Sequence, residues 1–378
     1  MTRSIWLLTT FLAAPALAQT VNLTVKPTEG QPTRVRIETK ITTEEDRQIL
    51  INGEEGFGGR GGFGGMGGGE MSLSQKVEFD EGANWRQYHT VEVTQLRPDR
   101  DGEIRESKVE GGLTGKKVFM KANPEGGTVL TEGTGEDATE LSQALANGVP
   151  VKIDLSGLLP SKEVAVGEEF PLEASFVKAL SSLAHPVNAD SGNRRGRGGD
   201  QGGGRGGRGG RGDEQGGGRG GRFGRMSRTR TPSSVVAQLI GGGKLKSDVT
   251  GTLVSVENGR AVIDISGKLT GKGSNEELGL PNARSMWGGR GGRGGRGGQS
   301  GGNSANAVNA SMDINGQIWV DLASHQVSDM KIKGKVSVAQ TSNMTREGRD
   351  GEEMSIESTN DTKGRFEVKL HCEPAESK

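Results

Sequence analysis

The chain has 378 residues, and 37 of its 66 glycines lie in three tracts, residues 56–69, 194–230 and 288–302. The rest has an ordinary share of glycine and few aromatic residues, which favours a core of Val, Ile and Leu over an aromatic-rich pocket. Formal charges balance overall, but the tract 194–230 carries a net charge of +8 and the tract 288–302 carries +3. An acidic body therefore bears basic arms. After the first 18 residues the chain contains no apolar run of about 20 residues, which excludes a membrane-spanning helix there.

Residues 1–18 predict a secretory signal peptide. Arg3 gives a positive start, Ile5 to Ala14 form a short apolar run, and Ala16-Leu17-Ala18 is a small-x-small cleavage site. The expected location is therefore the periplasm, the cell envelope or the extracellular space. The only cysteine is Cys372, so the expected state is an unpaired thiol, with an intermolecular disulfide as the alternative.

The N-terminal half of the body has the period of β-strands. Residues 33–41 alternate apolar and charged side chains, and Val91 and Val93 continue the same period. Residues 116–121 and 128–131 are expected to be two strands joined by a turn at 123–127.

The C-terminal half has the same character. Asn258-Gly259 predicts a tight hairpin turn within 252–269, because Asn and Gly tolerate positive φ. A second Asn-Gly, at 315–316, predicts another turn, and residues 330–338 and 366–370 alternate again. The fold class is therefore mainly β (a β-rich α+β fold), with antiparallel meanders forming two lobes; a meander, a sandwich and an open barrel are all compatible with the spacing of the strands.

Two short helices are expected, at Ala138–Asn147 and Ser175–Ala184, as covers over the sheet. The predicted organisation is a β-rich lobe at 19–187, a disordered Arg/Gly-rich linker at 188–231 and a second β-rich lobe at 232–378. Disordered loops are expected at 54–70 and 284–308, since glycine loses the most entropy on ordering. Whether the lobes share one sheet or form two domains stays open.

The segment 148–176 contains Leu159-Pro160, Val164, Val166-Gly167 and Phe170. It resembles a pattern, roughly LP...V.VG..W, of exported bacterial β-rich proteins without an established activity, although Phe170 stands where tryptophan is commoner. The resemblance implies export and a β-rich fold, and it implies no catalytic residues.

Three further patterns have weak functional interpretations. Residues 133–138 fit G-x-G-x-x-A, but Glu136 and Asp137 would oppose a pyrophosphate, so an acidic helix start is expected. Residues 99–102 resemble the opening of a calcium loop without its remaining ligands, so a turn is expected. The histidines lie far apart in sequence and have no metal-site spacing, so neither a metal nor a cofactor is predicted.

The Arg-Gly repeats resemble the RGG boxes of RNA-binding proteins, which bind by phosphate neutralisation and stacking. Few aromatic residues interleave with them, and export removes cellular RNA, so a physiological nucleic-acid role is not expected. Arg211-Gly212-Asp213 spells an adhesion tripeptide that a tract of this composition produces by chance. The possible anion-contacting residues are Arg205, Arg208, Arg211, Arg219, Arg222, Arg290, Arg293 and Arg296.

The sequence favours an exported, non-catalytic protein with a binding or structural role in the envelope or outside the cell. One alternative is a carrier that holds an apolar ligand in a curved-sheet cavity, and another is binding of anionic polymers or RNA through the Arg-Gly tracts. An enzyme ranks behind these, because no spacing nominates a pair of carboxylates. A deep apolar cavity would favour the carrier, and a filled core would favour the binding or structural role.

Overall fold

The computed structural model describes residues 20–23, 32–55, 70–98, 103–123, 128–146, 149–172, 174–184, 236, 239–240, 244–275, 277–278, 305–347 and 352–375. The expected signal peptide, the linker 188–231 and the predicted calcium-like turn at 99–102 lie outside these residues. So do most of the two predicted loops.

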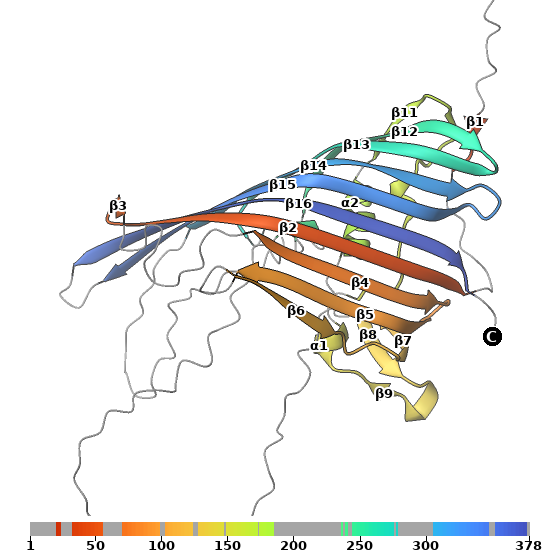
Figure 1. Cartoon of the computed structure of the whole chain (residues 1–378), viewed down its shortest axis with the longest axis horizontal. Helices are drawn as coiled ribbons and strands as arrows, with labels where there is room; N and C mark the ends of the chain where they lie inside the picture. Colours follow the sequence, from red (N-terminus) through yellow and green to blue (C-terminus); the bar gives the residue numbers. More distant parts are fainter. Residues whose placement is uncertain are drawn as a thin grey trace, which may run out of the picture.

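Fourteen described strands form one antiparallel sheet (Figure 1). Its order is β11-β12-β13-β14-β15-β16-β2-β4-β5-β7-β8-β9, with β3 paired to β2 and β6 paired to β5. The first strands are β2 (Thr33–Ile51), β3 (Glu54–Glu55), β4 (Met71–Glu81), β5 (Trp85–Pro98), β6 (Ile104–Glu110), β7 (Lys117–Ala122), β8 (Thr128–Glu132) and β9 (Thr139–Glu140). The others are β11 (Glu169–Leu172), β12 (Lys246–Glu257), β13 (Arg260–Gly273), β14 (Ala305–Asp321), β15 (Gln326–Glu347) and β16 (Glu353–Pro374). Strands β1 (Thr20–Val21) and β10 (Val164–Ala165) form a separate pair.

The two predicted lobes are halves of this single sheet. The last strand, β16, pairs with the early strand β2 from Ile356 opposite Ile51 to Pro374 opposite Thr33. Strands more than 300 residues apart in sequence are thus hydrogen-bonded neighbours, and the described strands share one continuous core. The mainly β, antiparallel fold class is confirmed.

One Asn-Gly prediction is confirmed and the other is wrong. Asn258 and Gly259 have φ of 50° and 75° and connect β12 to β13, as a two-residue hairpin turn requires. Asn315 and Gly316 instead lie inside β14, where they pair with Lys333 and Ile332 of β15. Pairing on both sides of β14 keeps this segment extended.

The second predicted helix is confirmed as α2 (Ala174–Ala184), which buries Phe176, Val177, Leu180 and Leu183. The first one is reduced to a single turn, α1 (Gln143–Ala146). The residues before it form a 3-10 turn at Gly135–Asp137 and then β9, which pairs with β8. The residues that were expected to start the helix therefore pair with β8 as a strand.

Both loop predictions are too long at one end. Asn52 and Gly53 form a turn with φ of 52° and 82°, so Glu54 and Glu55 fold back to pair with β2. Strand β14 already begins at Ala305, where it pairs with Asn343.

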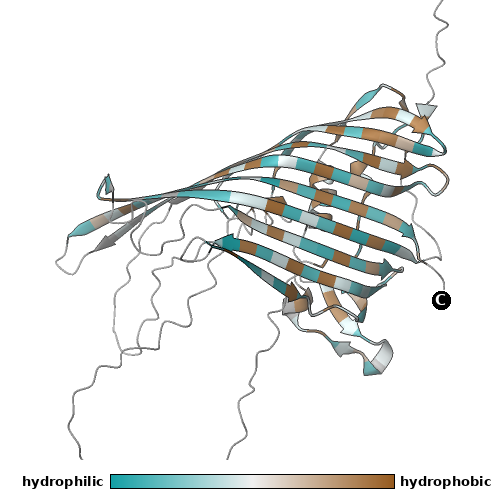
Figure 2. Cartoon of the chain, in the orientation of Figure 1, coloured by the Kyte–Doolittle hydropathy of each residue, from teal (hydrophilic) through white to brown (hydrophobic). Residues whose placement is uncertain are grey.

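Apolar and polar residues alternate along the long strands (Figure 2). The apolar residues point to the face that α2 covers. Buried side chains from the segments before and after α2 pack against the same face. We call this the inner face, and the opposite, polar side the outer face. In the resemblance motif, Gly167 has φ of 86° in a turn and Phe170 is buried against Gly251, so the motif has a structural role here.

Glycines on the inner face let neighbouring strands approach closely and the sheet curve. A Cβ atom at Gly316 would overlap the carbonyl oxygen of Lys331, and one at Gly334 would overlap that of Asp313. Gly267 and Gly364 meet the backbone of the next strand in the same way. Such strand-interior glycines mark sharp bends and close backbone approach.

Gly316→Ala is expected to destabilise the fold by about 2–3 kcal/mol, because the added methyl group meets rigid backbone and not a flexible side chain. Asn315→Ala, an exposed neighbour on the outer face, is the control and should change stability by under about 0.5 kcal/mol. Urea unfolding of both variants measures the difference. Equal stabilities would contradict the role of close strand approach.

Candidate ligand-binding face

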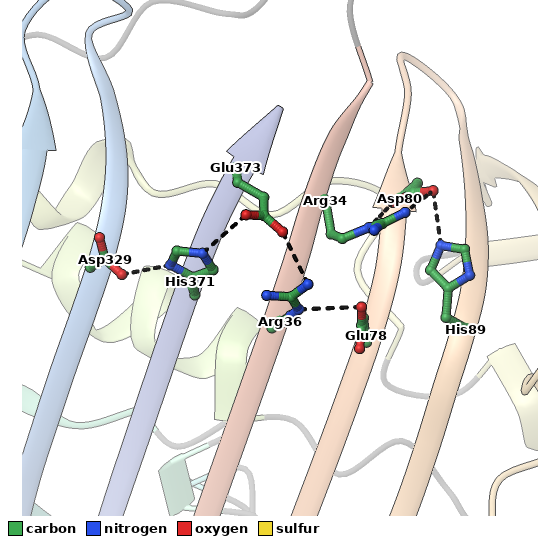
Figure 3. A network of polar contacts seen from close by, with 8 residues as sticks. All are labelled: Arg34, Arg36, Glu78, Asp80, His89, Asp329, His371 and Glu373. Carbon is green, nitrogen blue, oxygen red and sulfur yellow. Dashed lines mark hydrogen bonds and ion pairs between the residues drawn. The ribbon is translucent and has the colours of Figure 1, made fainter. Parts of the chain in front are cut away.

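The outer face of the central strands carries a row of charged side chains that connect through ion pairs (Figure 3). His371 on β16 contacts Asp329 on β15 at 2.6 Å through Nδ1 and Glu373 at 3.5 Å through Nε2. Glu373 accepts from Arg36 on β2 at 3.0 Å, and Arg36 reaches Glu78 on β4 at 3.2 Å. Ion pairs thus link four adjacent strands, β15, β16, β2 and β4, across the outer face.

A second group continues the row toward β5. Arg34 donates to both carboxylate oxygens of Asp80, at 2.8 and 3.3 Å, and His89 contacts the same carboxylate at 2.8 Å. Partial burial acts to raise the pKa of Asp80, but the hydrogen bonds from Arg34 and His89 outweigh it, and the pKa is lowered. This carboxylate therefore stays charged down to acidic pH.

Beside this row lies an open hollow of about 560 Å³. Trp319, on β14, is partly exposed there, next to Asp329 on β15 and Val262 on β13. Four cationic side chains and two carboxylates share the lining with His371: Arg36, Arg260, Lys331, Lys369, Glu38 and Asp329. An aromatic surface is thus surrounded by hydrogen-bond donors and acceptors.

The inner face contains a much smaller cavity. A cavity of about 30 Å³ lies between β2, β4, β5, the 149–153 segment and the end of α2, which is room for about one or two water molecules. Its wall includes the buried Arg86, which donates to Glu81 at 2.9 and 2.6 Å and to the carbonyl of Pro150 at 2.9 Å. The guanidinium also lies 4.8 Å from the centre of the Phe79 ring. Arg86 is therefore occupied in holding the 149–153 segment on the sheet.

The arginines predicted from the sequence as anion contacts all lie outside the described residues, as does the Arg-Gly-Asp tripeptide at 211–213. The residues of the outer-face row were not predicted. They are scattered from 34 to 373 in the sequence, and only the pairing of β16 with β2 brings them together. The charged positions at alternate residues of 33–41 were the one signal in the sequence.

The G-x-G-x-x-A segment is not part of a dinucleotide-binding unit in this sheet. It continues into a 3-10 turn and β9, and the strands of the sheet are antiparallel, whereas that unit needs parallel strands and a helix. Asp154, which has the spacing of a ribose-binding carboxylate, accepts from the backbone N–H and hydroxyl of Ser156. Those hydrogen bonds lower its pKa and fix a local turn.

The histidines and the cysteine considered in the sequence analysis can also be placed, except for His185, which lies outside the described residues. His89 and His371 lie on the outer face in separate ion pairs, and His325 forms the turn between β14 and β15 with φ of 54°. In the part of the chain that the structure describes, no group of three His, Cys, Asp or Glu residues is arranged to hold a metal. Cys372 is free, lies within β16, and has a pKa raised by burial to about 12, so its thiol is protonated at neutral pH.

No known family model matches the chain, and no curated protein matches it significantly. Among the described residues, no helix has the length and apolar character needed to cross a membrane.

Asp80→Asn is expected to lower stability by about 1 kcal/mol at pH 7, because Arg34 and His89 lose their shared charged partner. A carboxylate with a lowered folded-state pKa stabilises above its unfolded-state value, near 3.9, and loses this effect as pH falls through the folded value. The gap between wild type and variant should therefore shrink below about pH 4.

Denaturant midpoints at pH 7 and pH 3 measure the gap. Glu92→Gln removes a carboxylate from an exposed pair with Lys108 and serves as the control, with little change at either pH. A gap for Asp80→Asn that is equal at both pH values would contradict the electrostatic origin of the effect.

Proposed function

We propose that the protein acts after export as a non-catalytic binding protein, and that the hollow around Trp319 on the outer face holds an extended polysaccharide. The observation that carries this proposal is a partly exposed tryptophan on a broad sheet face, beside a hollow of about 560 Å³ with charged walls. The leader-like residues 1–18 support export, and N-terminal sequencing of the native protein should then begin at Gln19.

The openness of the hollow favours an extended ligand. Small-molecule sites are usually concave and bury most of their ligand, whereas this one is open along the outer side of β13, β14, β15, β16 and β2. A long molecule can lie across several strands and gain contact area in this geometry.

The chemistry of the lining favours a sugar chain. The C–H face of a pyranose ring stacks on an indole ring, and its hydroxyl groups both donate and accept hydrogen bonds. Trp319 offers the indole, Arg260 and Lys331 offer donors, and Asp329 offers acceptors. The ion pairs of His371 with Asp329 and Glu373 hold the neighbouring side chains in place, which reduces the entropy lost on binding.

The interior supports the binding role over the carrier alternative. Helix α2 packs its apolar side chains into the curved sheet, and the cavity beside its end measures only about 30 Å³. An apolar ligand of ordinary size would have to displace α2 from this core.

The test is a titration of the full secreted chain with neutral and acidic polysaccharides, followed by tryptophan fluorescence. Trp319→Phe should weaken binding at least about tenfold and remove most of the fluorescence change, since aromatic anchors dominate such contacts. Trp85→Phe is the matched control, because Trp85 lies on β5 under the Lys117 ammonium, 4.3 Å from the ring centre.

Binding that is unaffected by Trp319→Phe, or weakened equally by Trp85→Phe, would refute this location of the site. Failure of every polysaccharide to bind would refute the proposed function itself.

A further inference from the structure

Like charges face each other directly on the outer face of β15 and β16. Lys331 is the register partner of Lys369, and Lys335 is the register partner of Arg365. All four side chains lie on the outer face, at positions that alternate with the buried residues. Side chains directly opposite in an antiparallel pair lie about 5 Å apart, and like charges there are destabilising.

Carboxylates relieve this repulsion at one end only. Glu367 contacts Lys331 at 3.3 Å and Lys369 at 3.8 Å, and Glu38 contacts Lys369 at 3.9 Å. Lys333 lies directly opposite Glu367, and Lys335 and Arg365 lie farther along the strands. None of these three cations forms an ion pair with a described residue. Asp313 is the register partner of Lys335 on β14 but forms no ion pair with it. The like-charged pair Lys335 and Arg365, beyond Glu367, therefore has no ion-paired carboxylate among the described residues.

The lysines of β15 form a straight row. Lys331, Lys333 and Lys335 occupy alternate positions of one strand, so neighbouring members are about 7 Å apart and the row spans about 14 Å. Lys331 also lines the hollow that contains Trp319. The row therefore begins at the hollow and continues along the strand. A ligand that contacts all three ammonium groups needs anionic groups repeated along its length.

The geometry points to an acidic polysaccharide as the ligand: one sugar ring stacks on Trp319 while successive carboxylates pair with Lys331, Lys333 and Lys335. This inference rests on the proposed function and adds the charge of the substrate. Binding places anions between the like-charged pairs, so the repulsion within the free protein becomes attraction in the complex.

A nucleic acid would use the site differently. Single strands bind through several aromatic residues that stack successive bases, whereas Trp319 is the one Trp, Tyr or Phe among the described residues that line the hollow. A sugar chain with one stacked ring and repeated charges fits this arrangement better.

The experiment uses polygalacturonate as the acidic probe and its fully methyl-esterified form as a neutral probe with the same backbone. In the full chain, Lys333→Gln/Lys335→Gln should raise the Kd for polygalacturonate at least about tenfold, and the esterified polymer should bind the wild type at least about tenfold more weakly. Lys121→Gln/Lys178→Gln removes two exposed lysines from β7 and α2 and is the charge-matched control, with less than about a twofold effect.

Three results would overturn the inference. An equal loss in both double variants would assign the effect to net charge. Loss of binding in Arg290→Ser/Arg293→Ser/Arg296→Ser, with none in Lys333→Gln/Lys335→Gln, would assign it to the Arg-Gly tract. Single-stranded DNA binding more tightly than polygalacturonate, with the same lysine dependence, would replace the polysaccharide with a nucleic acid.

The outcome also separates this inference from the proposed function. If both probes bind equally and depend on Trp319 but not on Lys333 and Lys335, the polysaccharide site stands and its acidic specificity fails.

Discussion

The close approach of neighbouring strand backbones at inward-facing glycines is the constraint on which the rest of this structure depends. At Gly316 and Gly334 the next strand comes so near that no side chain fits. The long strands can therefore curve around α2, and the apolar residues of both halves of the chain meet in one core. A flatter sheet of this size would leave much of its inner face to water.

Curvature on one side fixes the other side as well. Because successive side chains of a strand point to opposite faces, a residue next to a buried residue of β15 points to the outer face. The burial of Met330 and Ile332 therefore directs Lys331 and Lys333 outward. The core thus holds the polar face in one register. Binding depends on this register, since a slip of one residue would move the outer-face side chains of a strand to the inner face.

The sequence predicted local features well and long-range ones poorly. The alternation in 33–41, the Asn258-Gly259 hairpin and the apolar stripe of α2 depend on neighbouring residues, and all three are confirmed. Asn315-Gly316 has the same local signature as a turn, but pairing with β13 and β15 on both sides overrides it. In such cases a local turn competes with pairing to neighbouring strands for the backbone hydrogen bonds. A short window of sequence does not contain those neighbouring strands.

The candidate site was hidden for the same reason. His371 and Arg36 are distant in sequence, and their contact through Glu373 follows from the pairing of β16 with β2. The Arg-Gly tracts, in contrast, are conspicuous in the sequence, and the predicted anion contacts were therefore placed on their arginines. A row such as Lys331, Lys333 and Lys335 looks like an ordinary solvated strand face until its register partners on β16 are known.

Lysine side-chain NMR tests the central claim most directly, because it reports where a polysaccharide lies without changing the charge of the protein. Dimethylated lysines, assigned by single Lys→Arg substitutions, are followed while polygalacturonate is added to the full chain. If an acidic polysaccharide binds along β15, the resonances of Lys331, Lys333, Lys335 and Lys369 should shift together, with Lys121 and Lys178 unchanged. Binding accompanied by shifts spread over lysines of both faces, or by no shift in the β15 row, would contradict it.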